Sequence, residues 1–188
     1  MEKNKKVAFF LAEGFEEVES LTVVDVLRRL GIHCDMVGIK EEYVKGAHNI
    51  LVKVDKILND DIKDYDLITL PGGMPGSTNL RDNKKVIEAV QYFSENDKYI
   101  AAICAAPIVL AKAGVIKGKN VTSYPGFEEE LSEGNYISSE NVVVDGKMIT
   151  SRGPATALAF SYKIAEELGA DVKDLKEGMM YNFLINQG

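Results

Sequence analysis

The chain has 188 residues, of which 46% are apolar and 27% charged, enough for one compact domain with a substantial buried core. This composition excludes disordered, collagen-like and coiled-coil classes. The net charge is -7, from 29 acidic and 22 basic side chains, and no basic run is long enough to neutralise a row of phosphates. We therefore expect a single domain over residues 1–188 and no nucleic acid as the principal partner.

The apolar stretches of the chain are too short for a secretory signal or a membrane span. Glu13 ends the first stretch, which begins at Val7, before it reaches the length of a signal core. The longest apolar run, residues 99–111, falls short of the roughly 20 residues that cross a bilayer. We expect no membrane partner.

The two cysteines, Cys34 and Cys104, are too few for a disulfide framework. The spacings that would join them to His33 and His48 around a metal ion are also missing. We expect no metal and a reducing, cytoplasmic location. Cys34 and His33 lie within a predicted strand, and both are interpreted as structural residues.

In chain order, short apolar runs rich in β-branched residues alternate with amphipathic stretches. We predict strands at 7–11, 34–39, 67–70 and 100–103, and helices ending at residue 30, near 86–93, after 103, at 155–168 and from 172 towards 181. Apolar runs without polar alternation are typical of a parallel sheet that is covered on both faces. The pattern predicts a doubly wound α/β fold. Residues 50–54 and 136–149 look half-exposed, and we predict antiparallel ribbons there, added at the sheet edge.

Ligands of such sheets bind beyond the carboxyl ends of the strands, so the residues that follow each strand are the candidates for chemistry. Four of these junctions carry chemically distinctive residues. They are 13–19, 71–76, 104–107 and 151–154. The sequence therefore predicts a functional site where these junctions meet.

Cys104 lies between a predicted strand and a predicted helix, with the small residues Ala102 and Ala106 two positions to either side. This is the pattern of a nucleophile elbow, in which a sharp turn holds the reactive side chain in a strained, exposed geometry. The positive end of the following helix favours thiolate over thiol. We predict that Cys104 is an activated sulfur. The alternative is a small buried hydrophobe, which is what most free cysteines are.

Glu19 belongs to the apolar stripe of the first helix, so its carboxyl points toward the sheet. The stripe is formed by Phe15, Val23, Val26 and Leu30. No lysine or arginine on the stripe pairs with Glu19, and burial would raise its pKa to a value that suits proton transfer near neutrality. The alternative is an acid that favours the helix N-terminus, a description that fits Glu16 and Glu17 better.

Gly72 and Gly73 follow a strand and offer backbone N–H groups that no side chain shields. Together with the N–H of Ala105 they are suited to hold the oxygen of a carbonyl attacked by Cys104. The alternative is a plain turn. No dinucleotide fingerprint or P-loop ending is present, so no nucleotide cofactor is expected. Arg152, just before a helix, is a candidate ligand for an anionic group, or else a partner in a structural ion pair.

Four motifs together resemble the DJ/ThiJ/PfpI superfamily, in the branch that contains the parkinsonism-associated protein. They are Gly14-Phe-Glu-Glu-Val-Glu19, Leu70-Pro-Gly-Gly73, Ala101-Ala-Ile-Cys-Ala-Ala-Pro107 and Thr150-Ser-Arg-Gly-Pro154. The resemblance runs almost end to end. It implies a flavodoxin-like domain, usually a homodimer, with Cys104 as nucleophile, Glu19 as its protonated partner, and Gly73 and Ala105 as oxyanion donors.

The resemblance also implies an activity without cofactors, on small aldehydes such as methylglyoxal (a glyoxalase) or on early glycation adducts (a deglycase). A second family trait is oxidation of the nucleophilic cysteine to a sulfinic acid, which would make the chain an oxidative-stress sensor or a redox-regulated chaperone. A third reading is a binding module in which Cys104 is inert.

Three residues depart from the relatives. Ala105 stands where protease-like relatives have a histidine, so a Cys-His peptidase is not expected. Tyr124 replaces a histidine near the cysteine, and a phenol with a pKa of about 10 is a poor base at neutral pH. We expect weak glyoxalase turnover, with Glu19 as the main proton carrier and Tyr124 as a candidate for contact with substrate. His48 replaces an arginine that reaches across the dimer, so we expect the interface to differ.

Overall fold

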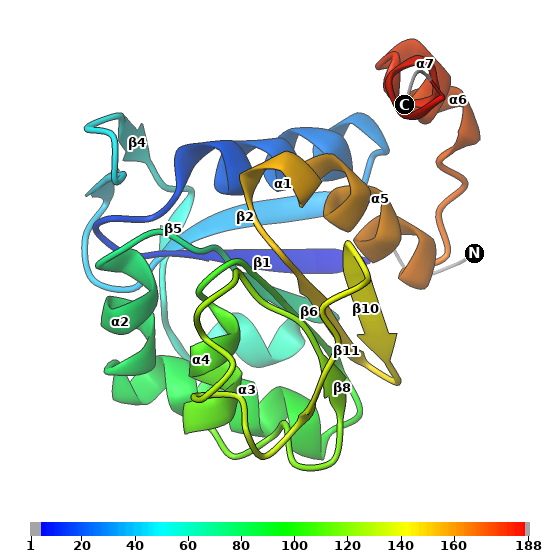
Figure 1. Ribbon diagram of the computed structural model, residues 1–188. Coiled ribbons are helices and arrows are strands. Elements are labelled where there is room, and N and C mark those ends of the chain that lie inside the picture. The colour runs from blue at the N-terminus through cyan, green and yellow to red at the C-terminus, as the bar shows by residue number, and fades with distance from the viewer. Residues whose placement is uncertain (1–4, 187–188) are drawn as a thin grey trace.

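The computed structural model describes residues 5–186, and a seven-stranded sheet forms its centre (Figure 1). The strand order is β10-β11-β7-β6-β1-β2-β5, and every neighbouring pair is parallel except β10 with β11. The strands are β1 (Lys6–Leu11), β2 (His33–Gly38), β5 (Lys56–Ile57), β6 (Leu67–Leu70), β7 (Tyr99–Ile103), β10 (Val142–Asp145) and β11 (Met148–Ser151). This is the doubly wound α/β fold that the apolar runs predict, of the flavodoxin-like kind that the family resemblance implies.

Helices cover both faces of the sheet (Figure 1). On one face lie α1 (Glu17–Arg29) and α5 (Ala157–Glu167), which pack against each other. The other face carries α2 (Gly76–Arg81), α3 (Lys84–Glu95) and α4 (Pro107–Lys112). Two short helices, α6 (Lys173–Gly178) and α7 (Tyr181–Ile185), end the described chain, and single 3-10 turns occupy Asp60–Asp64 and Pro154–Thr156.

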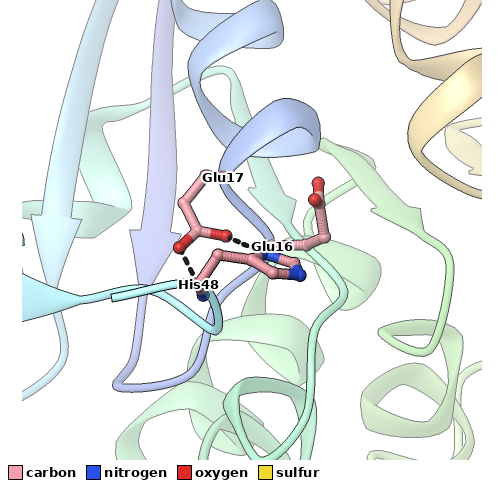
Figure 2. Close-up of side chains that lie close together, drawn as sticks. All are labelled: Glu16, Glu17 and His48. Carbon is pink, nitrogen blue, oxygen red and sulfur yellow. Dashed lines mark hydrogen bonds and ion pairs between the residues drawn. The ribbon is translucent and has the colours of Figure 1, made fainter. Parts of the chain in front are cut away.

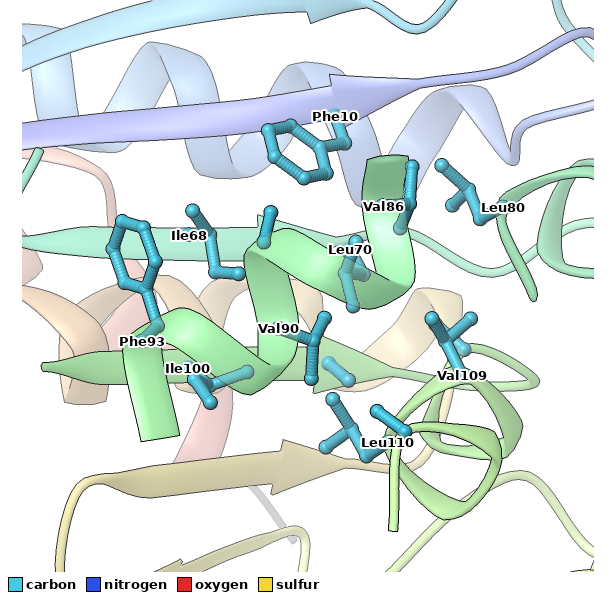
Figure 3. Close-up of a cluster of buried hydrophobic side chains, with 14 of the residues drawn as sticks. Phe10, Ile68, Leu70, Leu80, Val86, Val90, Phe93, Ile100, Val109 and Leu110 are labelled. Atoms are coloured by element: carbon cyan, nitrogen blue, oxygen red, sulfur yellow. The ribbon is translucent and has the colours of Figure 1, made fainter. Parts of the chain in front are cut away.

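Neighbouring residues of one strand supply the two hydrophobic cores. Phe9 packs under α1 and α5, whereas Phe10 faces the α3 side of the sheet, and both are fully buried. On the α3 side, Val86, Val90 and Phe93 recur at helical spacing and meet the sheet residues (Figure 3). Successive side chains of a strand point to opposite faces of the sheet. A strand that is buried on both faces therefore needs the continuous apolar run seen in the sequence.

Two predicted features are corrected by the structure. Residues 50–54 do not extend the main sheet, because β4 (Leu51–Lys53) pairs only with β3 (Tyr43–Lys45), in a separate antiparallel hairpin. Residues 136–149 do include an antiparallel edge strand, β10, but β11 lies inside the sheet between β10 and β7 and is fully buried. A further two-stranded pair joins β8 (Asn120–Val121) to β9 (Asn135–Tyr136).

The C-terminal helix predicted from residue 172 towards 181 is present as α6 and ends at Gly178. The separate helix α7 begins after Met180, whose φ of 58° lies in the left-handed region. Among residues 5–186, no helix has both the length and the apolar character that a membrane crossing requires.

Candidate active site around Cys104

Three segments that follow neighbouring strands meet beyond the carboxyl ends of β1, β6 and β7. Glu19 lies on α1 after β1, Gly72 follows β6, and Cys104 follows β7. A Cβ atom built on Gly72 would lie 2.5 Å from Cys104 Cβ, 2.8 Å from Cys104 Sγ and 2.7 Å from Glu19 Oε2. Gly72 is therefore the contact point at which the cysteine and the glutamate come together, and it has no room for a side chain.

Cys104 has a φ of 64°, in the left-handed region that few residues with a side chain adopt. Its backbone is fixed on both sides, because its N–H donates to Ser151 O (3.0 Å) and its carbonyl accepts the N–H of Tyr124 (2.9 Å). The small residues Ala102 and Ala106 are fully buried in the turn. The strand, the sharp turn and the helix occur where the sequence predicts them, and the Cys104 side chain is partly accessible.

Glu19 is fully buried on the face of α1 that packs on the sheet, as its place in the apolar stripe predicts. Its Oε2 accepts a hydrogen bond from the N–H of Gly72 (2.8 Å). Its other oxygen, Oε1, is buried without a well-formed hydrogen bond. The Cys104 sulfur, which lies on the same side of Gly72 as Oε2, is the polar side-chain group that interacts with this carboxyl.

Burial raises the pKa of Glu19 to about 7, with the hydrogen bond from Gly72 acting in the opposite direction. A carboxyl with this pKa exchanges its proton readily at neutral pH, which is the property that the sequence predicts.

The pKa of Cys104 is raised to about 12, first by burial and then by the charge and hydrogen bond of Glu19. The sequence predicts a lowered pKa for the Cys104 thiol, and this direction is wrong while Glu19 is charged. Burial of the thiol outweighs the favourable effect of the N-terminus of the six-residue α4. The contribution of Glu19 depends on its own proton. When Glu19 is protonated its charge no longer opposes the thiolate, so the two groups titrate as a coupled pair.

Gly73 and Ala105 present backbone N–H groups to the Cys104 sulfur, and these hydrogen bonds lower the pKa of its thiol. Gly73 has a φ of 88°, and a Cβ there would lie 2.4 Å from both Gly14 O and Glu16 N. Only glycine fits this position. The two amides predicted as oxyanion donors thus lie at the same sulfur.

Arg152 follows β11, which pairs with β7 on the side away from β6 and β1, and Tyr124 is joined to the cysteine through its N–H, which donates to the Cys104 carbonyl. The Tyr124 side chain is half exposed, and its ring packs over Gly153, with Cδ2 at 3.2 Å from a Cβ placed there. Arg152 donates from Nη1 to the carbonyl of Ser138 (2.7 Å) and to Thr122 Oγ1 (3.4 Å). Among the described residues no carboxylate forms an ion pair with Arg152, so its observed role is to hold the loop before β10.

The two remaining predicted structural residues differ in exposure. Cys34 is buried in β2, where burial raises the pKa of its thiol to about 12. His33 begins the same strand but is exposed, with Nε2 at 2.9 Å from Asp35 Oδ2. Both lie at or near the amino end of the strand, away from Cys104.

A pair that the sequence analysis missed lies at the start of α1 (Figure 2). Glu17 is buried, and its carboxylate accepts the N–H of His48 (2.6 Å) and lies 2.7 Å from His48 Nδ1. Hydrogen bonding to Glu17 raises the pKa of His48. With Glu16, these side chains offer three ligand atoms within 4.8 Å of one another, although Glu17 and His48 already bond to each other. Glu17 and His48 are 31 residues apart in the chain, so no local sequence pattern indicates that they pair.

The fold and this arrangement define a flavodoxin-like protein with a cysteine at a strand-to-helix turn beside a buried glutamate. The model of the DJ-1/PfpI family matches residues 5–167, and the chain belongs to that family. Protein dj-1beta of Drosophila melanogaster is 40% identical over 182 residues, covering 94% of this chain and 97% of that protein.

The crystal structure of Drosophila melanogaster DJ-1beta superposes with a TM-score of 0.91 at 39% identity, covering 95% of this chain and 98% of that chain. A relative from Caenorhabditis elegans is named glutathione-independent glyoxalase DJR-1.2. It is 35% identical over 158 residues, covering 83% of this chain and 84% of that protein. The family resemblance expected from the four motifs is confirmed.

Proposed function

We propose that the chain is a cofactor-independent cysteine enzyme that acts on small reactive aldehydes or on early glycation adducts. The Cys104 thiolate adds to the aldehyde carbon, and the resulting oxyanion accepts hydrogen bonds from the N–H groups of Gly73 and Ala105. Glu19 removes the hydrogen of the former aldehyde carbon as a proton. It then returns a proton to the neighbouring carbonyl carbon, which leaves a thioester on Cys104. Water then hydrolyses the thioester, which releases a 2-hydroxy acid and restores the thiol.

The observation that carries this proposal is the approach of Glu19 Oε2 and Cys104 Sγ to the same side of Gly72, at 2.7 and 2.8 Å from the position that a Cβ atom would take there. Burial raises the pKa of the Glu19 carboxyl to about 7, so at neutral pH it is present in both protonation states and serves as acid and base in turn. The existence of a relative named as a glyoxalase supports the same class of reaction. Tyr124 and Arg152 flank the cysteine junction and are the candidates for contact with the rest of the substrate, together with the backbone of Gly72.

The test is the conversion of methylglyoxal to lactate by the purified chain without added glutathione. We expect activity in the wild type and its loss in Cys104→Ser and Glu19→Gln, whereas Cys34→Ser, which changes the other cysteine, should retain it. Unchanged rates in both site variants would contradict the mechanism. Weak turnover is expected because Tyr124 supplies no base.

A second candidate function is an oxidative-stress sensor, or a chaperone switched by oxidation, in which Cys104 is converted to a sulfinate. The observation in its favour is the difference between the two cysteines, because Cys104 is partly accessible whereas Cys34 is buried. A protonated Glu19 would donate a hydrogen bond to a sulfinate oxygen. Mass spectrometry after mild peroxide treatment should find Cys104 oxidised before Cys34. The reverse order would remove this candidate.

We also propose that the chain acts as a homodimer in the cytoplasm. Apolar side chains are exposed on α1 and on the adjoining β3–β4 hairpin, and a partner would cover them. They are Val18 (53% exposed), Leu21 (37%), Ile50 (50%) and Leu51 (60%). Because His48 lies in the same hairpin and bonds to Glu17 of its own chain, we expect that this interface would not use the side chain of residue 48 across the dimer.

A further inference from the structure

We propose that Glu17 and His48 form a clasp that positions the carboxyl of Glu19, which makes both of them positioning residues for the site at Cys104. Neither residue touches Cys104 in the contacts described above. The inference rests on the proposed function only through the role that it gives to Glu19.

Residues 14–19 are held from two sides by hydrogen bonds. On one side, the hairpin loop bonds to them through backbone groups, since the N–H of Gly14 donates to Lys45 O (2.8 Å) and the N–H of Ala47 donates to Phe15 O (2.8 Å). The side chain of Glu17 adds the two bonds to His48, at 2.6 and 2.7 Å.

On the other side, the same residues bond to the glycine turn after β6. The N–H of Glu16 donates to Gly72 O (3.0 Å), and the N–H of Gly76 donates to Gly14 O (3.2 Å). The carboxylate of Glu19 completes this side by accepting the N–H of Gly72. The segment that carries Glu19 is thus fixed between the hairpin and the turn that contacts Cys104.

The Glu17 carboxylate is buried, so water cannot take its place as the acceptor for His48. Glu17 is 4% exposed, and a Cβ on Gly46 would lie 2.3 Å from its Oε1, so the hairpin backbone packs directly on the carboxylate. Removing the carboxylate would leave the N–H of His48 without its acceptor and open a gap between the hairpin and α1. The first turn of α1 would then be free to move, and Glu19 lies only two residues further along that turn.

The charged groups that act on His48 are Glu17 and, more weakly, Glu16, whose own carboxylate accepts the N–H of Glu19. All the charged groups that shift the pKa of His48 are therefore negative, and they favour its positively charged form. The clasp is strongest as an ion pair, below the raised pKa of His48 and above the lowered pKa of Glu17.

The test is a titration of the Glu19 carboxyl by carbon-13 NMR in the full chain. Because burial is the largest cause of the raised pKa of Glu19, loosening the first turn admits water and lowers that pKa toward 4.5. In Glu17→Ala we expect the midpoint to fall by at least about one unit, a tenfold change in proton affinity. His48→Ala, which keeps the backbone N–H, should shift it in the same direction by less.

Two variants serve as matched controls. Glu17→Gln retains an acceptor for the N–H of His48 and offers an amide donor to its ring, so it should restore the wild-type midpoint. His33→Ala removes the other histidine–carboxylate contact, at the amino end of β2, and should leave the midpoint unchanged.

A folded Glu17→Ala chain that titrates Glu19 at the wild-type midpoint overturns the proposal. If Glu17→Ala does not fold, His48→Ala decides in the same way. A second measurement is the pH profile of Cys104 alkylation. The double variant Glu17→Ala/Glu19→Gln should have the same profile as Glu19→Gln alone. Additive shifts would mean that Glu17 acts independently of Glu19. None of these measurements requires turnover, so a failed methylglyoxal assay would count against the proposed function alone.

Discussion

The N–H of Gly72 donates to Oε2 of Glu19 at 2.8 Å, while the space beside the same glycine Cα is filled by the side chain of Cys104. One residue without a side chain thus touches both members of the candidate site. The backbone of Gly72 fixes the carboxyl, and its missing Cβ lets the sulfur approach.

Gly72→Ala should destabilise the fold and separate the pair. The new methyl group would lie 2.5 Å from Cys104 Cβ, so the atoms around it must shift, and we expect a loss of about 1–3 kcal/mol in the free energy of unfolding. Urea denaturation measures this loss. Gly178→Ala, at a position where a Cβ meets no atom within 4 Å, is the control and should cost nothing comparable. Equal stabilities of the two variants would contradict the contact.

The stability of the fold should fall as the pH rises from about 4.5 to about 7. Because Glu19 has a raised pKa in the folded chain, the folded state binds more protons than the unfolded state in this window, and stability declines with pH. Full ionisation costs about 3 kcal/mol by this linkage. Unfolding curves of the wild type and Glu19→Gln isolate the effect, since all other groups titrate in both. A difference that does not change with pH would mean that Glu19 titrates normally.

Glu19→Gln should move the alkylation profile of Cys104 to lower pH. The negative charge of Glu19 raises the pKa of the thiol, and an amide removes that charge while the N–H groups of Gly73 and Ala105 remain. Rates of iodoacetamide reaction across pH 6–11, chosen to bracket the thiol, measure the shift. Cys104→Ser reports the residual reaction of buried Cys34. A profile that moves upward would show that Glu19 activates the sulfur chiefly as a proton donor.

Leu51→Glu should weaken the proposed homodimer. Leu51 is 60% exposed on the hairpin beside α1, and a charge there opposes burial against a second copy. Sedimentation equilibrium should show a dimer for the wild type and a shift toward monomer for the variant. Leu184→Glu changes a similarly exposed leucine on α7 (66% exposed) and should leave the dimer intact. Dissociation by the α7 variant alone would place the interface elsewhere.

The sequence predicted the features that depend on local periodicity. The apolar runs of β1, β6 and β7 gave the sheet, and the position of Glu19 in a helical stripe gave its burial. The place of β11 inside the sheet was missed because its pairing with β7 joins residues nearly 50 positions apart, which a half-polar pattern does not reveal. The direction of the pKa shift at Cys104 was missed for a similar reason, since burial and the charge of Glu19 come from distant segments.

The left-handed backbone at Cys104 carries a thermodynamic consequence of its own. A residue with a Cβ pays about 1–2 kcal/mol to hold this conformation, whereas glycine adopts it freely. Relaxation of that torsion would swing the amide of Ala105 away from the sulfur. Two hydrogen bonds, from Cys104 N–H to Ser151 and from Tyr124 N–H to Cys104, therefore keep the backbone in this strained conformation.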